Sequence, residues 1–256
     1  MSRMKGLEMK YWNIAPLILG KGPRDKSFFT YLRDPGIKIE IAMLAWLVFN
    51  EDEKMIIDTG PSPPSRTAKF HKPVSQTPEQ TLEAQLGRLH TGFDEIKIVI
   101  NTHLHWDHCY GNSLFREARF YVQRREMDYA RDPLPTSAQM YEAGQEGIEP
   151  PFEGIDFELL EGDTELAPGI RVMLTPGHTP GIQAVCVQTR EGIYTIAGDT
   201  IPLFDNLKVP DHDSFIPSGN FIDLREYFTS LGRIKALGST ILPGHDPRVL
   251  EKSVYP

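Results

Sequence analysis

Runs of consecutive hydrophobic residues, each ended by turn-forming residues, recur along the chain. Such short continuous runs are typical of buried β-strands. Eight of them are expected to form strands: residues 39–49, 55–57, 96–100, 120–122, 170–174, 184–187, 193–197 and 240–242.

Two other segments carry hydrophobic residues at helical spacing. Thr77 is a candidate N-cap, with Pro78 in the first turn and Gln80 at the capping-box position, which predicts a helix from Thr77 to about His90. A second helix is expected late in the chain and is stopped by Gly238. Its apolar positions recur every three or four residues: Leu224, Tyr227, Phe228, Leu231, Ile234 and Leu237.

The predicted strands outnumber the helices and often follow one another without a helix between them. This order favours packed sheets with outer helices over a doubly wound parallel sheet. No repeat or Gly/Ser linker divides the sequence, so residues 1–256 are expected to form a single domain. Stretches rich in Pro and Gly at 60–76, 132–154 and 200–220 are expected to be long functional loops.

Composition narrows the class of protein. The 256 residues are 40% hydrophobic and 24% charged, as in ordinary globular proteins, and the net charge of −8 disfavours nucleic acid or an anionic membrane as a partner. The longest apolar run, 41–49, is far shorter than the roughly 20 residues of a spanning helix. We expect a cytoplasmic protein that binds a small molecule, with Cys109 and Cys186 as free thiols.

A cluster of metal-ligand side chains directly follows the predicted strand 96–100. It places His103, His105, Asp107 and His108 within six positions. Imidazole nitrogens and carboxylate oxygens are the donors that zinc and related divalent ions prefer. Burying these groups together without a cation would be costly, so the cluster predicts a metal site.

Three further candidate ligands each follow a predicted strand and lie beside glycine. They are His178 in Pro-Gly-His-Thr-Pro-Gly, Asp199 after Gly198, and His245 in Pro-Gly-His-Asp. Strand ends could bring them to one rim of a sheet. The isolated histidines His71, His90 and His212 are interpreted as ordinary core or surface residues.

The order of these motifs resembles that of the metallo-β-lactamase superfamily over nearly the whole chain. The resemblance implies an α+β fold, an αββα sandwich of two mixed sheets with outer helices. By similarity, Asp58 in Asp-Thr-Gly would hold the ligand loop. The resemblance also implies two metal ions: His103, His105 and His178 on the first, Asp107, His108 and His245 on the second, and Asp199 bridging.

Within the superfamily, the sequence looks most like the N-acyl homoserine lactonase, or quorum-quenching, branch. The similarity lies in the chain length, the Glu161-Gly-Asp163 turn, the segment around His178 and the late Gly-His245-Asp246. Members of that branch commonly carry a tyrosine three residues after the bridging aspartate, and here this position is Pro202. Tyr110, beside the ligand cluster, is an alternative donor to the substrate.

The expected activity is the opening of a lactone ring by a hydroxide that two metal ions generate from water. Zinc is the first expectation, with manganese, iron or cobalt as alternatives. Asp107 and Asp199 are the expected catalytic residues, and Asp107 would relay a proton to the leaving alkoxide. The substrate would be a small lactone or ester. The sequence is also compatible with a homodimer.

The same ligands are compatible with three other functions. They are hydrolysis of a different lactone, ester or thioester, an iron-dependent redox enzyme on the same scaffold, and a non-catalytic metal-binding protein. A serine hydrolase is disfavoured because the sequence has no Gly-x-Ser-x-Gly motif. Cys109 is interpreted as a small core residue, and Phe70, Phe204, Phe215 and Phe221 as loop residues that suggest an apolar pocket.

Overall fold

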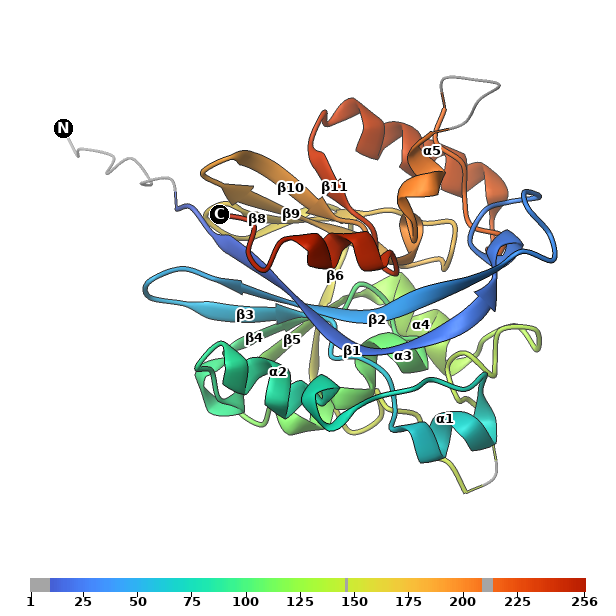
Figure 1. Cartoon of the computed structure of the whole chain (residues 1–256), viewed down its shortest axis with the longest axis horizontal. Helices are drawn as coiled ribbons and strands as arrows, with labels where there is room; N and C mark the ends of the chain where they lie inside the picture. Colours follow the sequence, from blue (N-terminus) through green and yellow to red (C-terminus); the bar gives the residue numbers. More distant parts are fainter. Residues whose placement is uncertain (1–9, 146, 209–213) are drawn as a thin grey trace.

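Two β-sheets pack face to face and helices cover their outer faces in the computed structural model, which describes residues 10–145, 147–208 and 214–256 (Figure 1). The α+β sandwich that the sequence predicts is therefore confirmed. The first sheet has six strands, in the spatial order of the chain: β1 (Asn13–Asp25), β2 (Lys38–Phe49), β3 (Lys54–Ile57), β4 (Ile98–Ile100), β5 (Arg119–Gln123) and β6 (Phe157–Leu160). Its first three strands are antiparallel, and β3 to β6 run parallel.

The second sheet has five strands and is also mixed. In spatial order it contains β11 (Thr240–Leu242), β10 (Gly192–Ile196), β9 (Gln183–Thr189), β8 (Ile170–Leu174) and β7 (Thr164–Ala167). Only β10 and β11 are parallel neighbours. Because ligands commonly bind beyond the carboxyl ends of parallel strands, the pairs β3/β4 and β10/β11 are the places to look for a site.

Alternating side chains of the strands divide the core into layers. On β2, Leu44 and Trp46 face the second sheet, where they meet Val172 and Val185. The alternate residues Ala45 and Leu47 pack with α2 (Leu82–Arg88) on the outside of the first sheet. This two-sided burial explains why β2 reads as a continuous apolar run.

The second sheet is covered on its outer face by the longest helix, α5 (Leu224–Ala236). Of the predicted apolar positions, Tyr227, Leu231 and Ile234 are buried and pack on Met173 and Ala184 of the sheet, whereas Phe228 is exposed. The Asp223 side chain caps the helix by accepting a hydrogen bond from Glu226 N. The remaining helices are shorter: α1 (Pro64–Phe70), α3 (Trp106–Cys109) and α4 (Arg124–Arg131).

The eight predicted strands are all present, with ends shifted by at most two residues. Three strands were missed: β1, β6 and β7. In β1 the apolar positions are interrupted by Pro16, Gly20 and Gly22, and the pairing with β2 shifts register between Ile18 and Gly20. The other two are half-buried strands of four residues at the edges of their sheets.

The helix predicted from Thr77 to His90 was wrong in its length. Thr77 does cap a turn, but this turn is a short 3-10 helix over Pro78–Gln80. Thr81 then adopts an extended conformation and its side chain caps α2 separately. The expected loop 60–76 also contains α1, which begins with Pro64.

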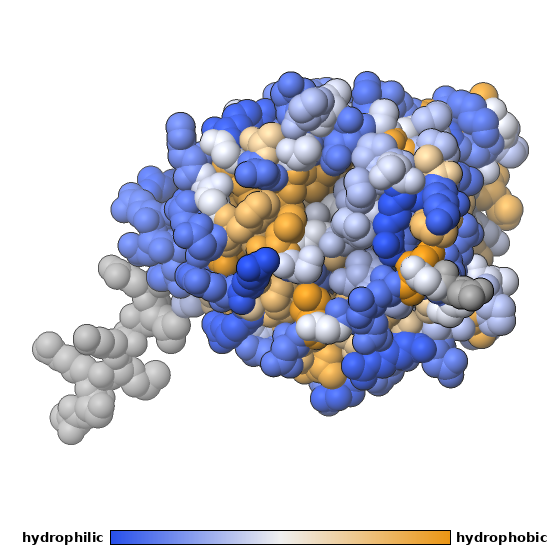
Figure 2. All heavy atoms as spheres, turned by 90° about the horizontal axis from the view of Figure 1, so that it is seen from below, coloured by the Kyte–Doolittle hydropathy of each residue, from blue (hydrophilic) through white to orange (hydrophobic). Residues whose placement is uncertain are grey.

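Seen from below, the surface has hydrophobic residues gathered toward its middle and hydrophilic residues around them (Figure 2). In the part of the chain that the structure describes, no helix is long and apolar enough to cross a bilayer. Both cysteines are free thiols, as expected. His212, one of the three isolated histidines, lies outside the described residues.

Candidate functional site

All seven predicted ligands converge at one edge of the sandwich, where loops from both sheets meet. The first sheet supplies the segment after β4, which turns into α3. The second sheet supplies the loop between β8 and β9, the turn after β10 and the turn after β11. These segments carry, in chain order, His103, His105, Asp107, His108, His178, Asp199 and His245, and every one of these residues is at most 9% exposed.

Three histidines form one potential ligand group. His103 Nε2 lies 3.0 Å from His105 Nδ1, and His178 Nε2 lies 3.3 Å from the same His105 atom. One nitrogen from each ring falls within 4.8 Å of the others. Three imidazole nitrogens at this spacing suit one divalent ion.

A second potential group lies beside the first and includes a carboxylate. Asp107, His108 and His245 have one ligand atom each within 4.8 Å of the others. His245 Nε2 is 3.9 Å from Asp107 Oδ2, and His108 Nε2 is 4.0 Å from Asp107 Oδ1. These separations are too long for direct hydrogen bonds, so the side chains surround a space between them.

Asp199 lies between the two groups. Its Oδ2 is 3.3 Å from His178 Nε2, on the side of the three histidines. Its Oδ1 is 2.9 Å from His245 Nε2 and 3.3 Å from His108 Nε2, on the side of the second group. A carboxylate with one oxygen facing each group can be shared by two cations.

Unpartnered polar atoms test whether the residues fit a metal. Among the described residues, four buried side-chain polar atoms have no hydrogen-bond partner, and three belong to this cluster: Asp107 Oδ1, His108 Nε2 and Asp199 Oδ1. A buried polar group without a partner is costly. Cations between these atoms would remove that cost, so the donor set fits divalent metal ions.

The outward-facing nitrogens of three histidines are held by fixed acceptors. His178 Nδ1 lies 2.9 Å from the Asn220 carbonyl oxygen, and His245 Nδ1 lies 2.8 Å from that of Ala42. His108 Nδ1 lies 2.8 Å from Asp58 Oδ2. An N–H donated at Nδ1 leaves Nε2 as the lone-pair nitrogen, which is the form that binds a metal.

Asp58 holds the ligand loop, as the resemblance implied. It follows β3 with a positive φ of 57°. Its carboxylate accepts hydrogen bonds from Thr102 N at 2.7 Å and Thr102 Oγ1 at 2.8 Å, in addition to the contact with His108. Asp58 therefore connects the end of β3 to both ends of the ligand segment.

The histidines of the two groups have opposite pKa shifts. Burial, reinforced by the neighbouring imidazoles, holds the pKa of His103 and His105 well below the usual range. Burial would also lower the pKa of His108 and His245, but nearby carboxylates, chiefly Asp58 for His108 and Asp199 for His245, outweigh it and raise both. The first group is therefore neutral, with nitrogens free to bind a cation. The second group contains carboxylates, whose negative charge favours a cation beside His108 and His245.

A buried glutamate that the sequence did not single out joins two of the ligand loops. Glu126 is the third residue of α4 and is fully buried. Its Oε1 accepts hydrogen bonds from Leu104 N and Tyr141 Oη, and its Oε2 accepts from Thr179 Oγ1 and Gly181 N. Burial raises the pKa of Glu126, although the hydrogen bonds oppose this. In the sequence, the one feature that could have pointed to its burial is its position beside the apolar residues Met127 and Ala130 of this short helix.

A cavity of about 270 Å³, here called the site cavity, opens onto this cluster. Asp107, Asp199 and His245 form part of its wall. Trp106 lines the cavity and stacks on His71 with ring centroids 4.2 Å apart. The ten remaining wall residues divide equally. Five are apolar, namely Phe28, Phe29, Ile41, Met43 and Met140, and five are polar or charged, namely Arg24, Lys72, Thr136, Gln139 and Asn220.

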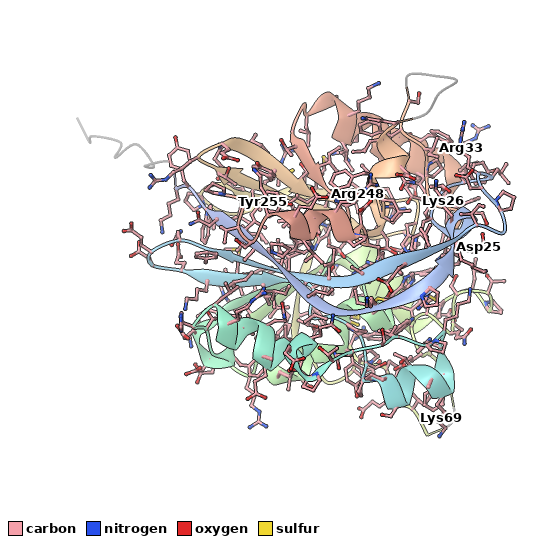
Figure 3. The ribbon with its side chains drawn as sticks, in the orientation of Figure 1. Asp25, Lys26, Arg33, Lys69, Arg248 and Tyr255 are labelled. Carbon is pink, nitrogen blue, oxygen red and sulfur yellow. The ribbon has the colours of Figure 1, made fainter. Side chains whose placement is uncertain are left out.

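The rim of the site cavity is fixed by the turn between β1 and β2. The Asp25 carboxylate accepts hydrogen bonds from Ser27 N at 3.1 Å and Gly36 N at 3.0 Å. These bonds close the segment that carries Phe28 and Phe29. The hydrogen bond from the Ser27 hydroxyl, together with these two backbone bonds, lowers the pKa of Asp25 to about 2. Figure 3 shows Asp25 at this turn, far from Tyr255.

Several aromatic candidates from the sequence lie elsewhere. The four loop phenylalanines do not line the site cavity, and Phe204 instead contacts Arg248, whose Cζ is 5.0 Å from its ring centroid. Tyr110 lies beneath Arg66, with 5.3 Å from the guanidinium carbon to its ring centroid, and is not part of the cavity wall. Its suggested role as a substrate donor therefore has no support in this arrangement.

Three other sequence interpretations can be compared with the structure. Pro202 is buried, and its carbonyl accepts a hydrogen bond from His245 N at 2.9 Å. The buried Cys109 thiol lies 3.4 Å from the Leu104 and His105 carbonyl oxygens, and burial raises its pKa, which agrees with a packed core residue. His90 is exposed, as expected of an ordinary histidine.

Comparison with known proteins decides the family. The profile of the Metallo-beta-lactamase superfamily matches residues 43–245, a span that contains all seven candidate ligands. The chain belongs to this superfamily. It is 25% identical to an N-acyl homoserine lactonase of Bacillus cereus over 242 residues, which cover 89% of this chain and 90% of the relative. It is 29% identical to a probable metallo-hydrolase of Methanocaldococcus jannaschii over 66% of each chain.

Solved structures of other proteins share the fold. An N-acyl homoserine lactone hydrolase with the product N-hexanoyl-L-homoserine bound at its catalytic metal center superposes with a TM-score of 0.77 at 23% identity, covering 95% of this chain and 96% of that one. A probable metal-dependent hydrolase from Staphylococcus aureus gives a TM-score of 0.76 at 17% identity, covering 94% and 91%. The predicted resemblance to N-acyl homoserine lactonases is confirmed.

Proposed function

We propose that the chain is a dinuclear metal-dependent hydrolase that opens a lactone ring with water as the nucleophile. The observation that carries the proposal is Asp199, whose two carboxylate oxygens face two separate groups of ligand atoms. A relative named as an N-acyl homoserine lactonase, 90% of which is covered at 25% identity, supports the substrate class.

In this proposal, His103, His105 and His178 would hold one ion, Asp107, His108 and His245 would hold the other, and Asp199 would be shared between them. Zinc is the expected metal, because histidine and carboxylate donors suit it. The bound ions would supply Lewis acidity, which lowers the pKa of water and polarises an ester carbonyl.

The chain's own residues then perform the remaining steps. Water adds to the carbonyl carbon, the ring C–O bond breaks, and the leaving alkoxide takes up a proton. Asp107, which is buried yet forms part of the cavity wall, is placed to take a proton from the attacking water and to deliver it to that alkoxide. The apolar wall around Trp106 and Met43 excludes bulk water and positions the substituent of the lactone.

The test is a substrate panel on purified protein with quantified metal. Lactones of different ring size and chain length are compared with linear esters and thioesters of matched acyl group, with oxygen consumption followed in parallel. We expect lactone opening that requires about two metal ions per chain. Preference for linear esters or thioesters, oxygen consumption, or metal binding without turnover would each contradict the proposal.

A further inference from the structure

The wall of the site cavity contains a buried cation with no carboxylate partner. Arg24, near the end of β1, is only 7% exposed and lines the cavity. Its Nη1 donates to the carbonyl oxygens of Pro23 at 2.9 Å and Pro73 at 3.2 Å, and its Nη2 donates to that of Lys72 at 3.3 Å. No carboxylate of the described residues forms an ion pair with it.

The backbone around Arg24 is shaped to admit its guanidinium group. A Cβ atom added at Gly22 would lie 3.0 Å from Arg24 Nη1 and 2.8 Å from the Pro73 carbonyl oxygen. Any larger residue there would therefore displace the group. The three bonds to carbonyls use three of the five N–H donors of arginine, which leaves one on Nε and one on Nη2 for a ligand.

A second cation lies at the rim of the same cavity. Lys72 is exposed, and its Nζ is 5.4 Å from the centroid of the Phe28 ring. It too has no ion-pair partner among the described residues. The acids in the cavity wall are Asp107 and Asp199, which the proposed function commits to metal ions. Burial lowers the pKa of Arg24, and the nearby charge of Asp107 opposes this without forming an ion pair. With Asp107 committed to a metal ion, Arg24 and Lys72 have no carboxylate partner of their own in the cavity wall.

Resting on the proposed function, we propose that the site cavity takes a substrate with an anionic substituent, a carboxylate, and that Arg24 binds this group. An uncharged acyl chain would cover a buried guanidinium without giving it a partner, which is costly. A carboxylate supplies two acceptors for the two remaining N–H donors. The apolar side chains of Ile41 and Met43 lie in the same wall and suit a short aliphatic spacer.

The experiment measures binding of matched probes to the metal-loaded protein by calorimetry. Hexanoate and adipate have the same six-carbon chain and differ only in a terminal methyl against a second carboxylate. One carboxylate of each can bind at the metal centre, so the affinity ratio isolates the contribution of the far end. We expect adipate to bind at least about tenfold more tightly, as for a hydrogen-bonded charge pair.

Variants assign that preference to one side chain. Arg24→Gln should bring the adipate-to-hexanoate ratio close to one, and Arg24→Lys should give an intermediate ratio. The ratio of the two affinities is compared, because a change in the cavity wall would alter both affinities together. Arg116→Gln is the matched control, because Arg116 is exposed and does not line the cavity. Lys72→Gln should reduce the ratio only a few-fold, as expected of an exposed charge. A 5-phosphonopentanoate arm shows whether a phosphate-like group is preferred over a carboxylate.

The outcomes separate this inference from the proposed function. Equal affinity for the two probes, or a preference that survives in Arg24→Gln, overturns the anion site. Lactone opening without an adipate preference would overturn the anion site alone. An adipate preference that depends on Arg24, in a protein that opens no lactone, supports the anion site and refutes the proposed function alone.

Discussion

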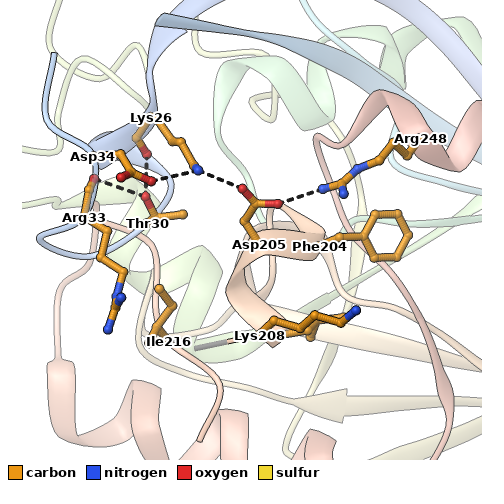
Figure 4. Close-up of a pocket in the computed structure, with 10 residues that line it drawn as sticks. Lys26, Thr30, Arg33, Asp34, Phe204, Asp205, Lys208, Ile216 and Arg248 are labelled. Carbon is orange, nitrogen blue, oxygen red and sulfur yellow. Dashed lines mark hydrogen bonds and ion pairs between the residues drawn. The ribbon is translucent and has the colours of Figure 1, made fainter. Parts of the chain in front are cut away.

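Two concave regions of the molecule differ in how their charges are compensated. The larger, here called the surface pocket, has a volume of about 570 Å³ and is lined by residues such as Lys26, Asp205 and Arg248 (Figure 4). Lys26 Nζ lies 2.8 Å from carboxylate oxygens of both Asp34 and Asp205, and Arg248 Nη2 lies 2.9 Å from Asp205. The pocket's carboxylates are therefore occupied by its own cations.

The smaller site cavity has the opposite character. Asp107 Oδ1 and Asp199 Oδ1 have no hydrogen-bond partner there, and the Arg24 guanidinium donates only to backbone carbonyl oxygens. Volume alone would have selected the surface pocket. Buried polar atoms without partners instead indicate the site cavity as the functional site. Such atoms destabilise the fold unless a ligand binds them.

The largest expected effect comes from removing the shared carboxylate. Asp199→Asn preserves the shape of the side chain but removes its negative charge and leaves one donor oxygen in place of two. We expect loss of at least one metal ion and a fall in lactone-opening rate of more than about 100-fold. Residues that only hydrogen-bond to a metal ligand already change metal affinity or activity by about 10–100-fold when mutated. Metal analysis and rates are compared with His90→Ala, which alters an exposed histidine. Wild-type metal content and rate in Asp199→Asn would contradict the bridging role.

The next effect is a loss of stability when the buried Glu126, which joins two of the ligand loops, is removed. Glu126→Ala removes the acceptor of four buried donors, and unsatisfied groups cost about 1–3 kcal/mol each. We expect the free energy of unfolding to fall by about 3 kcal/mol or more, measured by urea denaturation of the metal-free protein. Glu117→Ala, at a side chain that is 63% exposed, is the control. A loss no larger than the control's would show that the loops do not depend on Glu126.

A smaller effect is expected behind one ligand. Asp58→Asn weakens the acceptor that orients His108 Nδ1. Metal affinity should fall by about 10–100-fold, because such partners fix the tautomer and orientation of the ligand. Competition with a chelator measures this, with Asp52→Asn as the exposed control. Unchanged affinity would mean that the loop holds His108 without Asp58.

The smallest effect is expected in the surface pocket. The hydrogen bond from Lys26, followed by that from Arg248, lowers the pKa of Asp205. Its folded pKa lies below its unfolded pKa, so its stabilising contribution is present above the unfolded value near 3.9 and is lost as pH falls through the folded value. Asp205→Asn should cost less than about 1 kcal/mol at neutral pH and remove that acid dependence.

Metal content and lactone opening should not change in Asp205→Asn. The measurements are urea denaturation at several pH values and metal analysis. A fall in activity like that of Asp199→Asn would show that the two concave regions are functionally connected and would remove the distinction drawn between them.

Much of the fold could be predicted because buried strands leave a plain signal. The run 41–49 is apolar on both sides, since β2 has one sheet above it and α2 below. β1 was missed because its turns and register shift interrupt that signal. The helix after Thr77 was extended too far because Thr81 can continue a helical pattern or cap a new helix, and only packing decides between these.

The candidate ligands could be found because they are clustered and follow strands. Glu126 and Arg24 could not, since a single glutamate or arginine is ordinarily a surface residue. Their importance arises from contacts over long sequence separations, such as Glu126 with Thr179 and Arg24 with Pro73. His71 was interpreted as an ordinary residue, yet it lines the site cavity and lies 2.8 Å from the buried Glu142.

The origin of the donors in both sheets has a consequence for unfolding. His103 and His108 follow β4 of one sheet, whereas His178, Asp199 and His245 extend from the other. Ions bound between them would crosslink the two halves of the sandwich without a covalent bond. Separation of the sheets would then release the ions, so resistance to denaturation should rise with free metal concentration, by about 2.7 kcal/mol at one hundred times the dissociation constant.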